Sequence, residues 1–211
     1  MGELVLAAKV SHVPSLMLSE VEGSPLKSAR AGAVSALREL GRRARERRVS
    51  TFVVFDTHWL SNFGYHINAN PHHRGAFTSH EAPQMIQDLR YDLPGDPALA
   101  EAIAGEAAGA GLGVIAHRVA SLGLEYGTIV PMHYMNEDGW AKVVSVATPL
   151  FTSLEESRIL GEAVRRAVTL SGERVAILAS GSLSHRLWPN KKLGPEAWTS
   201  VTGATLRPKP S

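Results

Sequence analysis

The chain has 211 residues, of which 44% are hydrophobic and 20% charged, a composition typical of one soluble globular domain with a substantial core. Its 22 Lys and Arg residues nearly balance its 20 Asp and Glu residues, so the formal charge of +2 argues against nucleic-acid or membrane partners. The absence of cysteine excludes disulfides, thiolate metal sites and cysteine nucleophiles, and leaves nitrogen and oxygen atoms as the metal ligands.

The N-terminal segment predicts no export or membrane insertion. MGELVLAAKVSH lacks the charged region and the cleavage site of a signal peptide. No apolar run approaches the ~20 residues that a membrane-spanning helix needs. We therefore expect a cytoplasmic location and no membrane partner.

The first quarter of the chain predicts a strand, a helix and a second strand. The apolar run over residues 4–10 is typical of a buried strand. Ser24 is a plausible N-cap for a helix that has Pro25 as its first residue and ends near Arg48. The β-branched and aromatic run TFVVF over residues 51–55 predicts the next buried strand.

The middle of the chain is less regular. We expect a short strand over residues 64–70, then a proline-bounded loop over residues 71–83, and a short helix over residues 82–90. The loop is rich in histidine, and these side chains are either metal ligands or exposed loop residues: His72, His73 and His80.

The second half alternates helices and strands. Asp96 before Pro97 predicts the start of an Ala-rich helix that ends near residue 110. Ser153 opens a capping-box pattern, S-x-x-E, for a helix that ends near residue 170. Strands are expected at three further places, namely residues 114–117, 142–147 and 174–180.

This alternation predicts an α/β fold, with a mainly parallel sheet and helices on both faces in three layers. From Leu187 onward no periodic element is evident, and the polar, proline-containing TGATLRPKPS over residues 202–211 indicates a disordered tail. We expect one domain over residues 1–200 that is C-terminally incomplete, followed by a tail over residues 201–211.

Three of the predicted strands each lead into a histidine: His12, His58 and His185. In open α/β sheets, ligands bind just beyond the carboxyl ends of the strands. Imidazole is both the commonest protein metal ligand and the commonest general acid or base. The three residues therefore predict a site, whose chemistry is either metal binding or proton transfer.

Other polar residues near these strand ends have two possible roles each. Asp56, two residues before His58, either orients an imidazole or caps the strand end. Glu125 is either a site carboxylate or a helix-terminus or ion-pair residue. Ser182 and Ser184 either help to orient His185 or belong to a turn.

Four segments, in this order, together resemble the class III extradiol ring-cleavage dioxygenases, and the resemblance covers residues 1 to about 200. They are KVSHVPSL at 9–16, VVFDTHWL at 53–60, SLGLEYGTIVPMHYMNED at 121–138 and LASGSLSHRL at 178–187.

The resemblance implies a non-haem Fe(II) site made by two histidines and one glutamate, which leaves positions open for a substrate and O2. The family's two histidine ligands fall on His12 and His58, and its acid/base histidine falls on His185. Glu125 and His133, in the third segment, are further candidates for contacts to the ligands or the substrate. The family's glutamate ligand lies in a C-terminal segment beyond the part of this chain that resembles it, which implies an altered or shortened C-terminus.

The implied reaction is the opening of a catechol by O2 to a muconic semialdehyde in aromatic catabolism. The implied substrate is a catechol with an acidic side chain, such as 3,4-dihydroxyphenylacetate, and the implied assembly is a homo-oligomer. Two alternatives remain at this point. One is a non-catalytic binding module on the same fold, because the third ligand is missing, and the other is a zinc hydrolase that uses His12 and His58.

Overall fold

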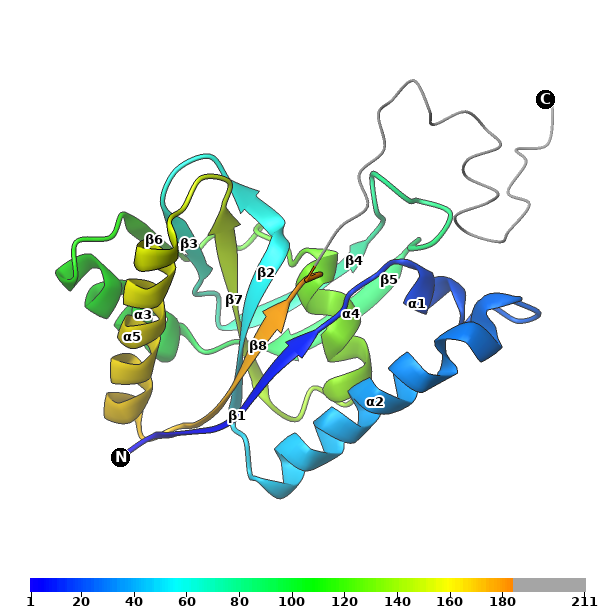
Figure 1. Cartoon of the computed structure of the whole chain (residues 1–211), viewed down its shortest axis with the longest axis horizontal. Helices are drawn as coiled ribbons and strands as arrows, with labels where there is room; N and C mark the ends of the chain where they lie inside the picture. Colours follow the sequence, from blue (N-terminus) through cyan, green and yellow to red (C-terminus); the bar gives the residue numbers. More distant parts are fainter. Residues whose placement is uncertain (184–211) are drawn as a thin grey trace.

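The computed structural model describes residues 1–183, and Ser184 and His185 lie outside the described residues. Six strands form one sheet in the order β1-β8-β2-β7-β3-β6, and two strands form a separate ribbon, β4-β5 (Figure 1). The strands are β1 (Glu3–Val10), β2 (Thr51–Ser61), β3 (Tyr65–Asn68), β4 (His72–Phe77), β5 (Leu89–Pro94), β6 (Val114–His117), β7 (Lys142–Pro149) and β8 (Arg174–Ser180). The helices are α1 (Ser15–Leu18), α2 (Leu26–Glu46), α3 (Pro97–Gly109), α4 (Tyr126–Met135) and α5 (Leu154–Ser171).

The six-stranded sheet is mostly parallel, as the sequence predicted. β8 lies between β1 and β2 and is parallel to both, and β2 is parallel to β7. The exception is the pairing of β3 with β7, which is antiparallel and joins Ile67 to Val146. The strands that supply the predicted histidines are therefore direct neighbours in one part of the sheet.

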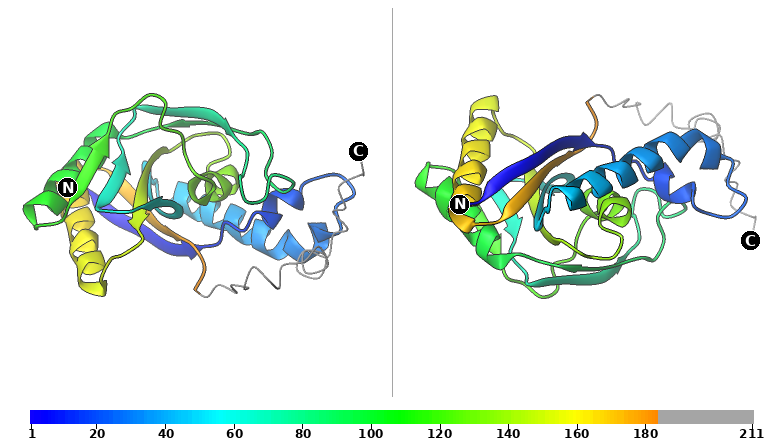
Figure 2. Two further views of the ribbon diagram at one scale, coloured as in Figure 1. Left: turned by 90° about the horizontal axis from the view of Figure 1, so that it is seen from above. Right: turned by 90° about the horizontal axis from the view of Figure 1, so that it is seen from below.

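Helices cover both faces of this sheet, which confirms the predicted three layers. Figure 2 shows α3 and α5 together on one side of the sheet and α2 on the other. α4 packs between α2 and the strands β2 and β8. Side chains of β2 alternate between two cores, with Phe52 and Val54 in the core under α2 and α4, and Val53 in the core under α3 and α5. Burial on both faces explains why this strand is apolar throughout.

The ends of the predicted helices follow the expected side-chain chemistry. Asp96 caps α3 by accepting from the Leu99 N–H, with Pro97 in the first turn. Ser153 and Glu156 form the full capping box of α5. α2 begins one residue later than predicted, at Leu26.

The ribbon corrects two predictions, because residues 71–83 contain strand β4 and residues 82–90 form a turn that runs into β5 instead of a helix. Burial of the side chains in the ribbon alternates with a period of two residues. Antiparallel pairs put His73 opposite Leu93 and Phe77 opposite Leu89, so alternate residues face the protein. The prediction gave weight to the bounding prolines and missed this alternation.

α4 was not predicted at all. Nine of its ten residues are buried, so its sequence has no polar face and no helical period to detect. It also contains Pro131, and a proline usually argues against a helix interior.

Among residues 1–183, no helix combines the length and apolar character that a membrane crossing requires.

Candidate active site

The parallel pairing of three neighbouring strands ends in register at one edge of the sheet. Val10 of β1 pairs with Ser180 of β8, and Ser180 pairs with Asp56 of β2. His12 follows the end of β1, and His58 lies within β2, two residues past its last pair with β8. The ring centroids of His12 and His58 are 4.9 Å apart in an edge-to-face arrangement. The structure therefore brings together the two histidines that the sequence placed in one site.

A local irregularity in β2 turns His58 out of the ladder. Asp56 pairs with Ala147 of β7, but the next pair joins Leu60 to Thr148, so three residues on β2 have no counterpart on β7. Insertions of this kind bend a strand and redirect side chains, and they often occur beside active sites. His58 lies in the middle of this insertion.

Asp56 stabilises the backbone of this insertion. Its carboxylate is fully buried and accepts from the backbone N–H groups of His58 at 2.8 Å and Trp59 at 3.2 Å, and from the Thr128 hydroxyl at 2.7 Å. Burial raises the pKa of Asp56, and these hydrogen bonds act in the opposite direction. Through these contacts Asp56 holds the backbone of His58 within β2.

His12 is buried and is held through its ring. Its Nδ1 lies 2.8 Å from the Ser180 hydroxyl, which in turn donates to the backbone carbonyl of Gly127. Gly127 belongs to the first turn of α4. The helix therefore contacts β8 through Gly127 and β2 through Thr128, and it reaches His12 through Ser180.

Tyr126 is a site residue that sequence analysis missed. Its ring lies against the His58 ring with centroids 3.8 Å apart, and its hydroxyl hydrogen-bonds to His58 Nε2. The hydroxyl is also 3.3 Å from Glu81 Oε2. Burial, together with the carboxylate of Glu81, raises the pKa of Tyr126, so the phenol stays protonated at neutral pH. In the sequence, the indication of this role was the position of Tyr126 next to Glu125, in the segment LEYGT.

Glu125 is the N-cap residue of α4, although its side chain makes no capping hydrogen bond. Burial is the main cause that raises the pKa of this carboxyl, and the nearby Asp56 carboxylate adds to it. The imidazole of His80, in the loop after β4, lowers the pKa of Glu125, so the two side chains lie near each other. A half-buried carboxyl with a raised pKa, next to Tyr126 in the sequence, is typical of a functional group.

The chain matches the family described as "Catalytic LigB subunit of aromatic ring-opening dioxygenase" over residues 6–203. It belongs to this dioxygenase family. It is 49% identical over 187 residues to a 3,4-dihydroxyphenylacetate 2,3-dioxygenase of Escherichia coli, which covers 88% of this chain and 67% of that protein. It is 30% identical over 208 residues to a 2-aminophenol 1,6-dioxygenase beta subunit of a Pseudomonas species, covering 92% of this chain and 67% of that subunit.

The dioxygenase thus spans about two thirds of the length of both curated relatives. Among solved structures, an uncharacterized protein from Escherichia coli K12 aligns with a TM-score of 0.49 and 19% identity, covering 80% of this chain and 64% of that one. Membership of an enzyme family favours an enzyme over the alternative of a non-catalytic binding module.

The expected Fe(II) site can be tested against the residues present. Two adjacent imidazoles suit a transition-metal ion that prefers nitrogen and oxygen ligands, and iron is one such ion. Within residues 1–183, no group of three His, Asp or Glu side chains is arranged to hold a metal ion. The described part of the dioxygenase therefore offers two fitting ligands, His12 and His58.

The remaining predicted residues lie elsewhere. His133 is seven residues beyond Tyr126, about 10 Å along the same helix, and pairs with Glu20 at 3.0 Å. His72 pairs with Asp92 on the surface of the ribbon, whereas His73 is buried with its Nε2 3.0 Å from the Val143 carbonyl oxygen. His185 and Ser184 are outside the described residues.

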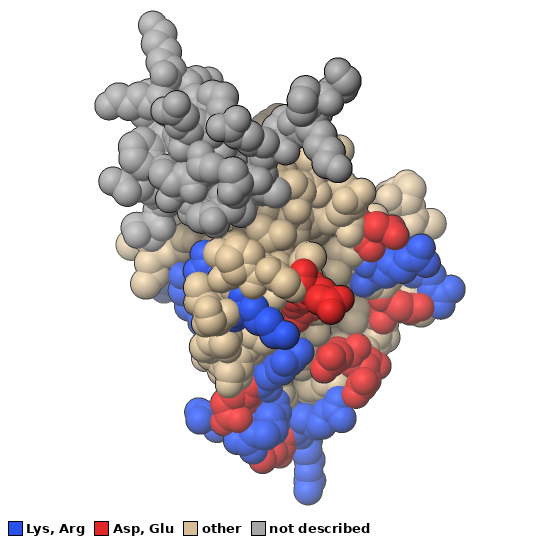
Figure 3. All heavy atoms as spheres, turned by 90° about the vertical axis from the view of Figure 1, so that its right-hand side faces the viewer, with Lys and Arg blue, Asp and Glu red and all other residues tan. Residues whose placement is uncertain are grey.

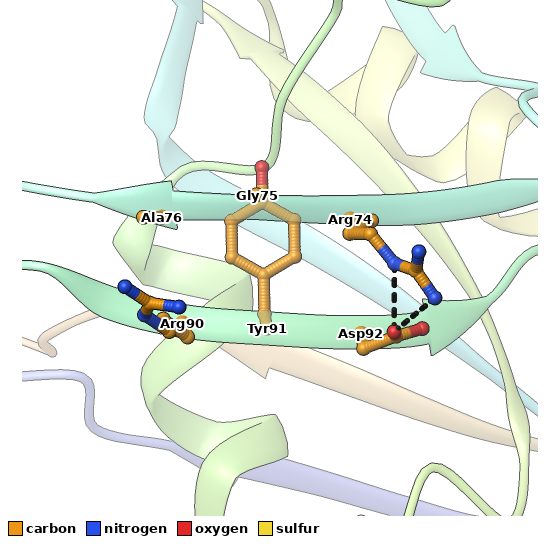
Figure 4. Close-up of a pocket in the computed structure, with 6 residues that line it drawn as sticks. All are labelled: Arg74, Gly75, Ala76, Arg90, Tyr91 and Asp92. Carbon is orange, nitrogen blue, oxygen red and sulfur yellow. Dashed lines mark hydrogen bonds and ion pairs between the residues drawn. The ribbon is translucent and has the colours of Figure 1, made fainter.

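The ribbon of the dioxygenase also carries a surface hollow of about 570 Å³ (Figure 4). The Tyr91 ring crosses the backbone at Gly75, and its hydroxyl accepts from the Leu124 N–H at 3.2 Å, next to Glu125. Arg74 pairs with Asp92 at its rim. On the face drawn in Figure 3, acidic and basic side chains are interspersed. The ribbon thus supports the segment that leads into the site.

Proposed function

We propose that this chain is the iron-binding catalytic part of an extradiol dioxygenase that opens 3,4-dihydroxyphenylacetate or a closely related catechol. The carrying observation is the 49% identity to a protein of that activity, together with the paired histidines at the sheet edge. In the proposed reaction both atoms of O2 enter the product. The ring bond beside the two hydroxyl-bearing carbons breaks, and a muconic semialdehyde results.

His12 and His58 are the proposed iron ligands, since each offers an imidazole at the carboxyl edge where such sheets bind ligands. Bound Fe(II) supplies open positions at which a catechol and O2 meet. The chain's own contribution is to hold the two imidazoles rigidly. It does so through Ser180 for His12, and through Asp56 and Tyr126 for His58.

Proton transfer is assigned to His185, which the resemblance identifies and which follows β8 in sequence. Its imidazole would take a proton from a catechol hydroxyl and return it before the ring opens, because a pKa near neutrality suits both steps. Glu125 is the proposed carboxylate of the described part. Its half-buried position beside Tyr126 supports a contact to the metal or the substrate.

The rings of Phe77 and Tyr126, with centroids 5.8 Å apart, offer an apolar wall beside His58. A catechol ring lying against this wall would keep water away from the reacting atoms. Phe77 ends β4, so the ribbon contributes directly to the proposed substrate pocket.

The deciding experiment loads the chain with Fe(II) without oxygen, then admits air together with 3,4-dihydroxyphenylacetate. We expect the yellow colour of a ring-opened semialdehyde, with one molecule of O2 consumed for each molecule of product. Zn(II) in place of Fe(II) is the control, because a zinc hydrolase would need no oxygen. A folded, iron-loaded chain that consumes no oxygen with this or related catechols would contradict the proposal.

Glu125→Gln tests the proposed carboxylate, with Glu137→Gln as a matched control on an exposed residue. We expect the first substitution to reduce turnover and the second to leave it unchanged.

We further propose a homo-oligomer in the cytoplasm. Support for an assembly comes from the beta-subunit designation of the Pseudomonas relative, and light scattering of the purified chain measures it.

A further inference from the structure

The proline inside α4 leaves one backbone carbonyl without its helical partner. In an α-helix, each carbonyl accepts from the N–H four residues later. For Gly127 that residue is Pro131, which has no N–H. Both residues are buried, and a buried carbonyl needs a donor from elsewhere. The spacing of Gly127 and Pro131 therefore creates a free acceptor at the end of the helix that faces the histidines.

Ser180 supplies the missing donor from the end of β8. Its hydroxyl is buried and donates to the Gly127 carbonyl oxygen. A serine hydroxyl has one hydrogen, and a carbonyl oxygen can only accept. The hydroxyl must therefore accept in its second contact, the 2.8 Å hydrogen bond with His12 Nδ1. It follows that His12 carries a proton on Nδ1, and that Nε2 is the basic nitrogen of the neutral ring.

We infer that Ser180 is a positioning residue that holds His12 in the Nδ1–H tautomer and so makes Nε2 the metal-ligating nitrogen. This inference rests on the proposed function for the role of His12 as an iron ligand. A ligating histidine commonly donates its second N–H to a carboxylate, a carbonyl or a water, which fixes the tautomer and the ring orientation. Here the Gly127 carbonyl accepts the hydroxyl proton of Ser180, and Ser180 can therefore only accept a hydrogen bond from His12.

The carbonyl that sets this direction is itself held in place. A Cβ atom on Gly127 would lie 1.9 Å from Asp56 Oδ1, so the helix start is in close contact with the strand end. Thr128, the next residue, donates to the same Asp56 carboxylate. The acceptor cannot turn away from Ser180 without breaking these contacts, so the tautomer is determined by the packing of α4 on the sheet.

The first test reads the tautomer of His12 directly, by imidazole nitrogen NMR of the metal-free, full-length chain at mildly alkaline pH, above the ordinary pKa of an imidazole. The His12 signals are assigned by their loss in His12→Gln. We expect the proton on Nδ1 in the unmodified protein and in Ser180→Thr, which keeps the hydroxyl. In Ser180→Ala we expect a mixture of tautomers. A proton on Nε2 in the unmodified protein overturns the inference, even if Ser180→Ala does not fold.

The second test measures Fe(II) affinity without oxygen by equilibrium dialysis. Ser180→Ala should weaken binding by about 10- to 100-fold, and Ser180→Thr should stay close to the unmodified protein. Ser19→Ala is the matched control, because that serine is also buried and also donates to a backbone carbonyl, that of Leu16. Unchanged affinity in a folded Ser180→Ala overturns the inference.

The two proposals fail in different ways. A chain that shows the Nδ1–H tautomer and binds Fe(II) but opens no catechol contradicts the proposed reaction and supports the role of Ser180. A chain that opens catechols with His12 protonated on Nε2 contradicts the role of Ser180 alone.

Discussion

The two histidines at the sheet edge are held by different means. The ring of His12 is fixed by a hydrogen bond at Nδ1. His58 is fixed mainly by its backbone, which Asp56 holds, and its ring lies against Tyr126. Substitutions around the site should therefore act differently on the two residues, even though both side chains serve the same proposed ion.

Removal of either imidazole should abolish iron retention. We expect His12→Ala and His58→Ala to lose Fe(II) after gel filtration, because neither loss is replaced within the described residues. His185→Ala should retain iron and slow turnover by about 100- to 10,000-fold. His72→Gln, on the ribbon surface, serves as the control. Normal iron retention by His58→Ala, measured by metal analysis, would show that the ligand assignment is wrong.

His73 should make stability depend on pH. Burial is the main cause that lowers the pKa of His73 below its ordinary value of 6.5. The unfolded chain then binds a proton that the folded chain resists, so stability falls as pH drops through about 6.5, by at most ~1.4 kcal/mol per pH unit. Urea unfolding across this range measures the effect. His73→Gln should reduce the slope, and an unchanged slope would assign the pH dependence to other groups.

At the scale of the element, α4 is the part that joins the site together. Its first turn contacts the ends of β8 and β2 through Gly127 and Thr128, and through Ser180 it reaches His12. An element buried on all sides cannot shift without opening the core. The position of this helix therefore sets the position of both imidazoles.

Gly127→Ala should damage both stability and iron binding. The new Cβ would lie 1.9 Å from Asp56 Oδ1 and 2.6 Å from its Cγ, so helix or strand must move. We expect a loss of about 1–3 kcal/mol in the free energy of unfolding, together with weaker Fe(II) retention. Gly105→Ala in α3 is the control, since its new Cβ has no atom within 4 Å apart from those of the adjoining helix backbone, and it should stabilise the protein by about 0.5–1 kcal/mol. Thermal unfolding of the two variants distinguishes local crowding from a general effect of alanine.

The predictability of each element depended on how local its signal is. β2 is revealed by its own β-branched run, and α5 by the capping box at Ser153. α4 and the ribbon depend on contacts that the local pattern does not contain. The same holds in the site, where His12 and His58 were found from strand ends. Ser180 is 168 positions from His12, and nothing local pairs them.

At the scale of the whole molecule, the two edges of the sheet have separate tasks. The carboxyl edge carries the histidines, whereas the amino edge carries an ionic cluster that ties helices to strands. Lys142 pairs with Asp96 at 2.9 Å and with Glu173 at 2.8 Å, and Thr51 donates to the same Asp96 oxygen. The cluster joins the starts of α3, β2, β7 and β8.

Lys142→Met should therefore lower stability without touching the site. It leaves the buried carboxylate of Asp96 short of a donor, at a cost of about 1–3 kcal/mol. The histidines lie a strand length away, roughly 25 Å, so Fe(II) affinity should not change. Lys27→Met, on an exposed part of α2, controls for loss of a positive charge. Reduced affinity in a folded Lys142→Met would show that the two edges are coupled.

The strand order also determines when the site can exist during synthesis. β8 lies between β1 and β2, yet it is the last strand of the described chain to leave the ribosome. His12 and His58 are made early, but His12 waits for about 170 further residues and His58 for about 120, which takes on the order of 6–30 s at ordinary translation rates. Until then the neighbouring edges of β1 and β2 are exposed. A growing chain of this protein is therefore open to wrong strand pairing for most of its time on the ribosome. The two proposed metal ligands cannot be held together by Ser180 before β8 is made.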